Sequence, residues 1–248
     1  MPKANRYFLP GHIWHITHRC HKQEFLLKFA YDRRAWIRWL FEAKKRYSLC
    51  ILNYVATSNH IHLLVKDRGD NEIPKSMQLV AGRVAQEFNQ RKKRKGAFWE
   101  DRYHATAIAS GDHFARCLTY MDLNMVRAGA VEDPVDWPES GYAELSQTKQ
   151  RYHLLDHQVL EELLGVTGNS EMYSTRRGWV EEAMRRNLLE RDSCWSGSLA
   201  VGDEEFVAGV KTGLGIKGWH RTVTKEGQGF VLRENEADYA ILPLKCQF

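Results

Sequence analysis

The chain has 248 residues, of which 43% are hydrophobic and 27% are charged, a composition typical of a folded protein of one or two domains. This composition excludes disordered, collagen-like and low-complexity chains. The apolar stretches are short and interrupted by charged residues, which excludes a membrane-spanning helix of about 20 residues. Positions 1–10 hold no apolar segment of the kind found in secretory signals, so we expect a cytoplasmic protein.

Positive charge is concentrated in the first half of the chain. Residues 1–130 carry 23 Lys and Arg against 11 Asp and Glu, a net charge of +12, whereas residues 131–248 have a net charge of −7. A basic half suits a polyanionic partner. A dense basic run followed by aromatic residues favours phosphate neutralisation and base stacking, although a solvated helix end has the same composition. These residues are Arg91, Lys92, Lys93, Arg94, Lys95, Phe98 and Trp99.

The cysteines give no sign of a disulfide framework or a cysteine-rich zinc site. There are five of them and no CxxC pair, so we expect reduced thiols. They are Cys20, Cys50, Cys117, Cys194 and Cys246.

The first half of the chain predicts six alternating elements. A strand over 14–19 precedes a helix over 25–47, and two β-branched runs, 50–56 and 60–66, form a hairpin. A helix over 74–94 and a strand over 98–108 follow. This β-α-β-β-α-β order predicts an α+β protein with a ferredoxin-like split antiparallel sheet, both helices lying on one face.

A further amphipathic helix is expected over 113–128, with Asp112 as N-cap and Gly129 as C-cap. Its apolar stripe belongs to the core, and its polar stripe faces something else. The apolar stripe is Phe114, Leu118, Met121 and Met125, and the polar stripe is His113, Arg116, Tyr120, Asn124 and Arg127.

The remainder of the chain carries no motif for chemistry. Pro134 and Pro138 mark a connection, and we place a domain boundary after it, between 1–145 and 146–248. The second region is expected to be a smaller, mostly helical extension, with helices over 181–190 and 204–214.

Two histidines could hold a divalent cation. His60 and His62 stand two apart on a strand, so both imidazoles share one face and Ile61 points to the core. An isolated H-x-H can equally be a pair of hydrogen-bonded surface residues. A second series recurs every third residue, which alternates between the faces of a strand and makes a poor metal site. That series is His12, His15, His18 and His21.

Tyr120 and Asn124 are four residues apart, so one helix face presents a phenol and, one turn later, an amide oxygen suited to a cation. Alone, this pair is as well explained by packing and solvation.

The combination of these motifs resembles the REP-associated tyrosine transposases, in the single-tyrosine branch of the HUH endonucleases. The matching segments are 59–65 (NHIHLLV) and 120–129 (YMDLNMVRAG), supported by 14–19 (WHITHR) and 98–103 (FWEDRY). Met121 replaces the usual isoleucine, and Met125 replaces a proline. The resemblance covers about residues 6–145.

The resemblance implies a metal-dependent endonuclease and strand transferase of single-stranded DNA. Tyr120 would be the nucleophile that forms a 5′-phosphotyrosine link, with Mg²⁺ or Mn²⁺ held by His60, His62 and Asn124. The expected substrate is a palindromic hairpin, placing the protein at the nucleoid. Expected DNA contacts are the basic run 91–95, Phe98, Trp99, Arg116, Arg127, His18 and Arg19.

Two other functions stay open at this point. One is a non-catalytic ferredoxin-like module that binds single-stranded nucleic acid, and the other is a metal-dependent hydrolase in which water is the nucleophile. The resemblance also leaves open whether the protein is a monomer or a homodimer, and whether Tyr120 acts on the site of its own chain.

Overall fold

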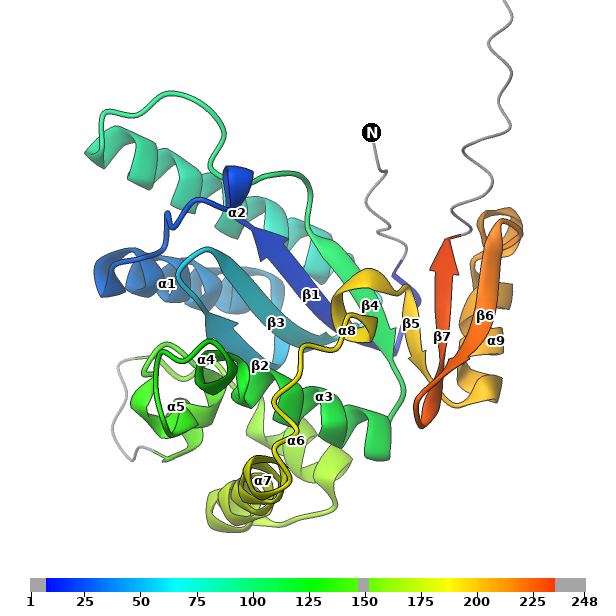
Figure 1. Cartoon of the computed structure of the whole chain (residues 1–248). Coiled ribbons are helices and arrows are strands. Elements are labelled where there is room, and N and C mark those ends of the chain that lie inside the picture. Colours follow the sequence, from blue (N-terminus) through cyan, green and yellow to red (C-terminus); the bar gives the residue numbers. More distant parts are fainter. Residues whose placement is uncertain (1–7, 147–151, 235–248) are drawn as a thin grey trace, which may run out of the picture.

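The computed structural model describes residues 8–146 and 152–234, in which one sheet has the strand order β2-β3-β1-β4-β5-β7-β6 (Figure 1). Residues 1–7, on which the expectation about a secretory signal partly depends, lie outside the described residues. Cys246 lies outside them as well. The strands are β1 Ile13–Arg19, β2 Cys50–Ala56, β3 His60–Lys66, β4 His104–Ile108, β5 Ala200–Gly202, β6 Arg221–Glu226 and β7 Gly229–Glu234.

The half of the sheet formed by β2, β3, β1 and β4 has the expected ferredoxin-like order, with antiparallel neighbours throughout. Helices α1 (Ala30–Tyr47) and α2 (Glu72–Arg91) pack against each other on one face of the sheet (Figure 1). Trp36 of α1 lies 6.2 Å from Tyr54 of β2 between ring centroids, and Tyr54 pairs with Leu63. The α+β prediction is therefore confirmed.

The opposite face carries the helices that build the site. Helix α3 (Asp112–Asp122) contacts β2, and the single-turn helix α8 (Cys194–Gly197) contacts β1 and β4 (Figure 1). Helix α7 (Gly168–Arg185) packs on α3. Helices thus lie on both faces of this part of the sheet (Figure 1).

Two elements are shorter than expected. The first helix begins at Ala30 rather than near residue 25, because Phe29 has an extended backbone (φ −90°, ψ 142°) and holds the N-cap position. The strand expected over 98–108 is regular only from His104, since Trp99 makes just an isolated bridge with Cys20.

The helix expected over 113–128 is divided at Leu123, whose ψ of 3° separates α3 from α4 (Asn124–Arg127). Asp112 is not its N-cap: Gly111 holds that position with φ +67°, a conformation that glycine adopts without strain. Gly129, with φ +65°, ends the segment as expected. Its N–H donates to the Val126 carbonyl, as in a Schellman motif.

The C-terminal region continues the same sheet. Strand β5 pairs in parallel with β4, so the sheet runs across the expected boundary at residue 145, and that boundary stays a prediction. Of the two helices expected here, one is the end of α7 and the other is α9 (Glu204–Gly213). The remaining helices are α5 Gly141–Ser146 and α6 His157–Leu164, with 3-10 turns at Pro134–Asp136 and Gly215–Gly218.

The four cysteines of the described part are buried and free. In the same residues, no helix is long and apolar enough to cross a membrane.

A buried ion pair joins α7 to α3. Arg176, 1% exposed, donates to both carboxylate oxygens of Asp122, at 2.6 and 3.2 Å. Asn53 of β2 donates to the same carboxylate at 2.8 Å. Since a buried charge is costly unless it is paired and hydrogen-bonded, these contacts hold β2, α3 and α7 in one arrangement.

We expect Arg176→Met to lower the free energy of unfolding by roughly 3–5 kcal/mol, because the Asp122 carboxylate stays buried without its partner. The matched control is Arg177→Met, which removes an exposed pair with Glu181 and should change stability little. Urea unfolding followed by circular dichroism measures both variants. An equal loss of unfolding free energy in the two variants would contradict a special role for the buried pair of Arg176 and Asp122.

Candidate active site

Strand pairing gathers the polar side chains of the site on one face of the sheet. The antiparallel register of β1 and β3 sets Thr17 opposite His62 and Arg19 opposite His60. Directly paired residues, and alternate residues along a strand, point to the same face. Both imidazoles therefore share a face, with ring centroids 4.8 Å apart, while Ile61 is fully buried on the other side, as the sequence predicts.

Each imidazole of the pair is held through its Nδ1 atom. His60 Nδ1 lies 2.7 Å from Asn59 Oδ1 and 2.9 Å from Thr57 Oγ1, and His62 Nδ1 lies 2.8 Å from His15 Nε2. This leaves the Nε2 atoms for the cavity in front of the sheet. Metal-binding histidines are commonly oriented in this way, by a hydrogen bond to the ring nitrogen that does not bind the metal.

The break at Leu123 brings Asn124 to the same place. Its side-chain Nδ2 lies 3.1 Å from His62 Nε2, and the Tyr120 ring centroid lies 6.3 Å from that of His62. All four predicted residues, Tyr120, His60, His62 and Asn124, line one cavity of about 780 Å³. The structure thus brings together residues from β3, α3 and α4, while the role of each stays a prediction.

Arginines surround this cavity. Arg127 lies over the Tyr120 ring at 4.2 Å and donates to the Tyr120 carbonyl at 2.9 Å. Arg19 and Arg191 also line the cavity. Arg116 lies 5.8 Å from the Trp195 ring instead and lines a neighbouring groove of about 1000 Å³ that also reaches Tyr120. The surroundings of Tyr120 are therefore cationic, which suits a phosphate group.

Burial and the arginines set the protonation of the site. The pKa of His60 is lowered to about 4, mainly by burial and then by repulsion from Arg19, Arg191 and Arg127. The pKa of His62 lies well below its usual range, mainly through burial and then through His60 and His15. Burial raises the pKa of Tyr120, and the charges of Arg127 and Arg191 act against this rise. The imidazoles are thus neutral, and the phenol needs activation.

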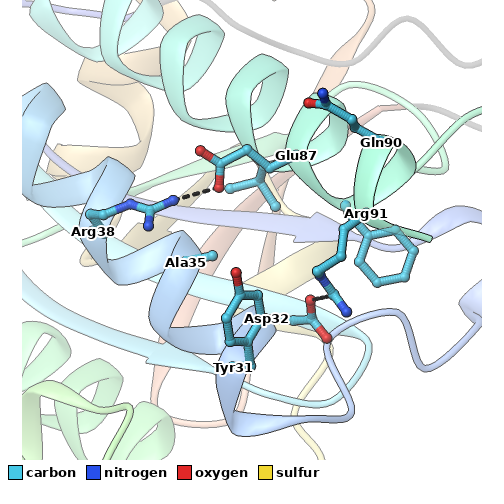
Figure 2. A pocket seen from close by; sticks show the side chains of 9 residues that line it. Tyr31, Asp32, Ala35, Arg38, Glu87, Gln90 and Arg91 are labelled. Atoms are coloured by element: carbon cyan, nitrogen blue, oxygen red, sulfur yellow. Dashed lines mark hydrogen bonds and ion pairs between the residues drawn. The ribbon is translucent and has the colours of Figure 1, made fainter. Parts of the chain in front are cut away.

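The basic run lies away from the cavity, at the ends of α1 and α2. Figure 2 shows Arg91 paired with the Asp32 carboxylate in the groove between these helices. Arg94 pairs with Glu24 at 3.4 Å. Two of the five positive charges of the basic run 91–95 are therefore paired with carboxylates, and the other three belong to exposed lysines. These are Lys92, Lys93 and Lys95.

Three residues expected to contact DNA form a packed aromatic cluster. Phe98 is 2% exposed and packs edge-on against Phe88 at 5.0 Å. His18 is 5% exposed and stacks at 4.1 Å on Trp99, which is partly buried and donates to the Ala81 carbonyl. His18 pairs with Ile61 in the register of β1 and β3, and it also borders the cavity that His60 and His62 line. Both side chains are buried in the DNA-free protein, so the DNA contacts expected of Phe98 and His18 stay predictions.

Three residues of the site are not predicted from the sequence. His15 belongs to the histidine series that makes a poor metal site as a group, yet it stands two residues before Thr17 and so shares the face of His62. Arg191 and Trp195 come from the C-terminal region, where no motif marks them. Only the spacing of His15 from Thr17 on the predicted strand could have indicated one of the three.

Comparison with protein families identifies this segment. Residues 10–122, which include the histidine pair and Tyr120, match the family described as "Transposase IS200 like". This match confirms, for residues 10–122, the resemblance to transposases that the sequence motifs indicate. The match ends before Asn124 and the C-terminal region.

A solved structure shows the same fold. The chain is similar to a REP-associated tyrosine transposase bound to a REP hairpin, with 19% identity, 63% of this chain and 94% of that chain covered, and a TM-score of 0.50. A candidate transposase from Deinococcus radiodurans R1 is 13% identical over 46% of this chain and 90% of that chain, and its TM-score of 0.35 is too low to establish a common fold. The comparison with curated proteins gave no significant match.

We expect the free energy of unfolding of the metal-free protein to fall as the pH is lowered from about 6.5 to about 4. Unfolded histidines take up a proton near pH 6.5, whereas burial lowers the pKa of both His15 and His60 to about 4 in the folded protein. The unfolded state therefore binds more protons in this window. Each histidine contributes a slope of about 1.4 kcal/mol per pH unit.

Urea unfolding at several pH values between about 7 and 5 measures this slope. His60→Asn should reduce the slope of the unfolding free energy against pH by the contribution of one histidine. An unchanged slope in that variant would show that His60 is protonated in the folded protein.

Proposed function

We propose that the protein nicks and rejoins single-stranded DNA at palindromic, REP-like hairpins, through a covalent link between Tyr120 and a DNA 5′-phosphate. The observation that supports this most strongly is the convergence of Tyr120, His60, His62 and Asn124 on one arginine-lined cavity. The match of residues 10–122 to the IS200-like transposases supports DNA transposition chemistry at this cavity. Such an enzyme would act on chromosomal DNA, at the nucleoid in the cytoplasm.

The donor atoms fit a divalent cation such as Mg²⁺ or Mn²⁺. Within the described residues, no cluster of three or more His, Cys, Asp and Glu has metal-binding geometry, so the candidate set combines two imidazoles with an amide. His60 and His62 would bind through Nε2, and rotation of the Asn124 amide would present its oxygen. A bound cation would polarise a non-bridging phosphate oxygen and favour attack at phosphorus.

The chain itself supplies the nucleophile and the phosphate contacts. The Tyr120 hydroxyl oxygen forms a bond to phosphorus, the bond from phosphorus to the 3′ oxygen breaks, and that oxygen leaves as a 3′-hydroxyl after taking up a proton. The phenolic proton passes to solvent. Arg127 and Arg191, beside Tyr120, would neutralise the phosphate. A second 3′-hydroxyl reverses these steps and joins the strands, so no nucleotide cofactor is needed.

Tyr120 lies beside the histidines of its own chain, which supports action in cis by a single protomer. The ring centroids of Tyr120 and His62 are 6.3 Å apart without any exchange of helices.

An exposed aromatic and basic surface supports a hairpin as substrate. Phe25, Phe29 and Tyr31 are each more than half exposed, at 65%, 58% and 59%. The Lys92 ammonium lies 5.5 Å from the Phe29 ring. These side chains offer the stacking that Phe98 cannot offer, next to the charges of the basic run. The loop before α1, which carries Phe25 and Phe29, also supplies Gln23 to the cavity, so one strand of DNA could reach both surfaces.

We expect Tyr120→Phe to abolish a metal-dependent covalent adduct with single-stranded hairpin DNA, because the variant lacks the attacking oxygen. Denaturing gels of labelled DNA, with Mg²⁺ or EDTA, detect the adduct. Tyr47→Phe, at the far end of α1, is the control and should behave as the wild type. Cleavage that survives in Tyr120→Phe would favour a water-using hydrolase, and tight binding without cleavage by the wild type would favour a binding module.

We expect Phe29→Ala to weaken hairpin binding by about 1–3 kcal/mol through lost stacking. Lys92→Ala should reduce the slope of log affinity against log salt by about 0.7–0.9, since one phosphate contact is lost. Lys45→Ala, an exposed charge on α1 outside this surface, is the matched control. Fluorescence anisotropy over a range of salt concentrations measures these effects, and equal effects of Lys45→Ala and Lys92→Ala would argue against a defined surface.

A further inference from the structure

A line of hydrogen bonds connects the C-terminal region to His62. The Trp195 carbonyl oxygen of α8 lies 2.8 Å from His15 Nδ1, and His15 Nε2 lies 2.8 Å from His62 Nδ1. The two imidazole planes differ by only 10°, with centroids 5.0 Å apart, a geometry that suits an in-plane hydrogen bond between the rings. His15 is fully buried, so water does not compete for these bonds.

The chemistry of the partners sets the direction of each bond. A carbonyl oxygen can only accept, so the His15 proton must be on Nδ1. A second proton on His15 would place a positive charge in the interior with no carboxylate bonded to it among the described residues, which is costly. His15 Nε2 therefore accepts, and His62 Nδ1 donates.

The far side of His62 agrees with this assignment. With its proton on Nδ1, His62 has a lone pair on Nε2, and the Asn124 Nδ2 group lies 3.1 Å from that atom as a donor. A neutral imidazole binds a cation through its unprotonated nitrogen. Without a fixed acceptor at Nδ1, His62 would populate both tautomers, and in one of them the proton would block the cation.

We infer that His15 is a positioning residue, which holds His62 in the tautomer able to bind a cation and is itself set by the Trp195 carbonyl of the C-terminal region. This inference rests on the metal-dependent function proposed above. It gives the C-terminal region, which lies outside the family match, a direct part in the site. The indole of Trp195 also lies 6.1 Å from the Tyr120 ring, so the same residue borders both the metal ligands and the nucleophile.

Thr106 provides a matched control for this chain of bonds. It pairs with His15 in the register of β1 and β4, and its Oγ1 donates to the Ser198 carbonyl at 2.7 Å and to the Trp195 carbonyl at 3.3 Å. Thr106→Val therefore removes a neighbouring buried hydrogen bond, mainly that to the Ser198 carbonyl, and leaves the bonding atoms of His15 and His62 unchanged.

The test compares Mn²⁺ binding by the DNA-free, full-length protein, followed by electron paramagnetic resonance of the free ion. We expect His15→Phe to weaken Mn²⁺ binding about 10–100-fold. His15→Gln, which keeps one donor and one acceptor, should retain most of the affinity, and Thr106→Val should bind as the wild type. Unchanged Mn²⁺ affinity in a folded His15→Phe protein would overturn the inference.

A second measurement does not depend on metal or activity. Nitrogen-15 spectra of the histidine rings in the metal-free wild type should show the His62 proton on Nδ1, and a proton on Nε2 would overturn the inference. If the wild type binds no Mn²⁺, the proposed metal function fails while the spectrum still decides the tautomer. If His15→Phe does not fold, the inference is tested by the nitrogen-15 spectrum and by the Mn²⁺ affinity of the His15→Gln variant.

Discussion

The antiparallel register between β1 and β3 is the constraint on which the site depends. It places His62 opposite Thr17 and His60 opposite Arg19. A shift of one residue would send both imidazoles to the face covered by α1 and α2, and would move Ile61 out of the core. Burial of apolar side chains on that face therefore also decides which side chains meet Tyr120, so that the core and the site are set by one pairing.

The C-terminal region is built into this arrangement. Strand β5 extends the sheet beyond β4, the pair of Arg176 with Asp122 holds α7 on α3, and α8 covers β1 and β4. The acidic composition of this region makes it unsuited to tracking a DNA backbone, yet it supplies Arg191 to the cavity. Its contribution is local: it closes the site around Tyr120 from the side opposite the sheet.

The electrostatics of the cavity serve two requirements together. A phosphate group needs positive charge around it, and a cation needs neutral imidazoles. Arg19, Arg127 and Arg191 lower the pKa of His60 through repulsion, in addition to the larger effect of burial. The same guanidinium groups that would attract the DNA therefore also keep the imidazole free of a proton, so the two requirements do not conflict.

Local sequence patterns account for the order of the elements and for part of the site. Hydrophobic periodicity and turn residues predict β-α-β-β-α-β, and a strand period of two is sufficient to place His60 and His62 on one face. Spacing of four residues likewise puts Tyr120 and Asn124 on neighbouring turns. These features depend on backbone geometry within a few residues, which is why they can be predicted without knowledge of the packing.

The remaining features depend on contacts between distant segments. The burial of Phe98 and His18, the break at Leu123 that brings Asn124 to His62, and the hydrogen bond from His15 to Trp195 all arise from how helices and strands pack on the sheet. A histidine on a strand looks the same in sequence whether it faces solvent, core or a second histidine. Strand register and the placement of α8 decide among these, because hydrogen bonds between residues far apart in the chain form only in the folded state.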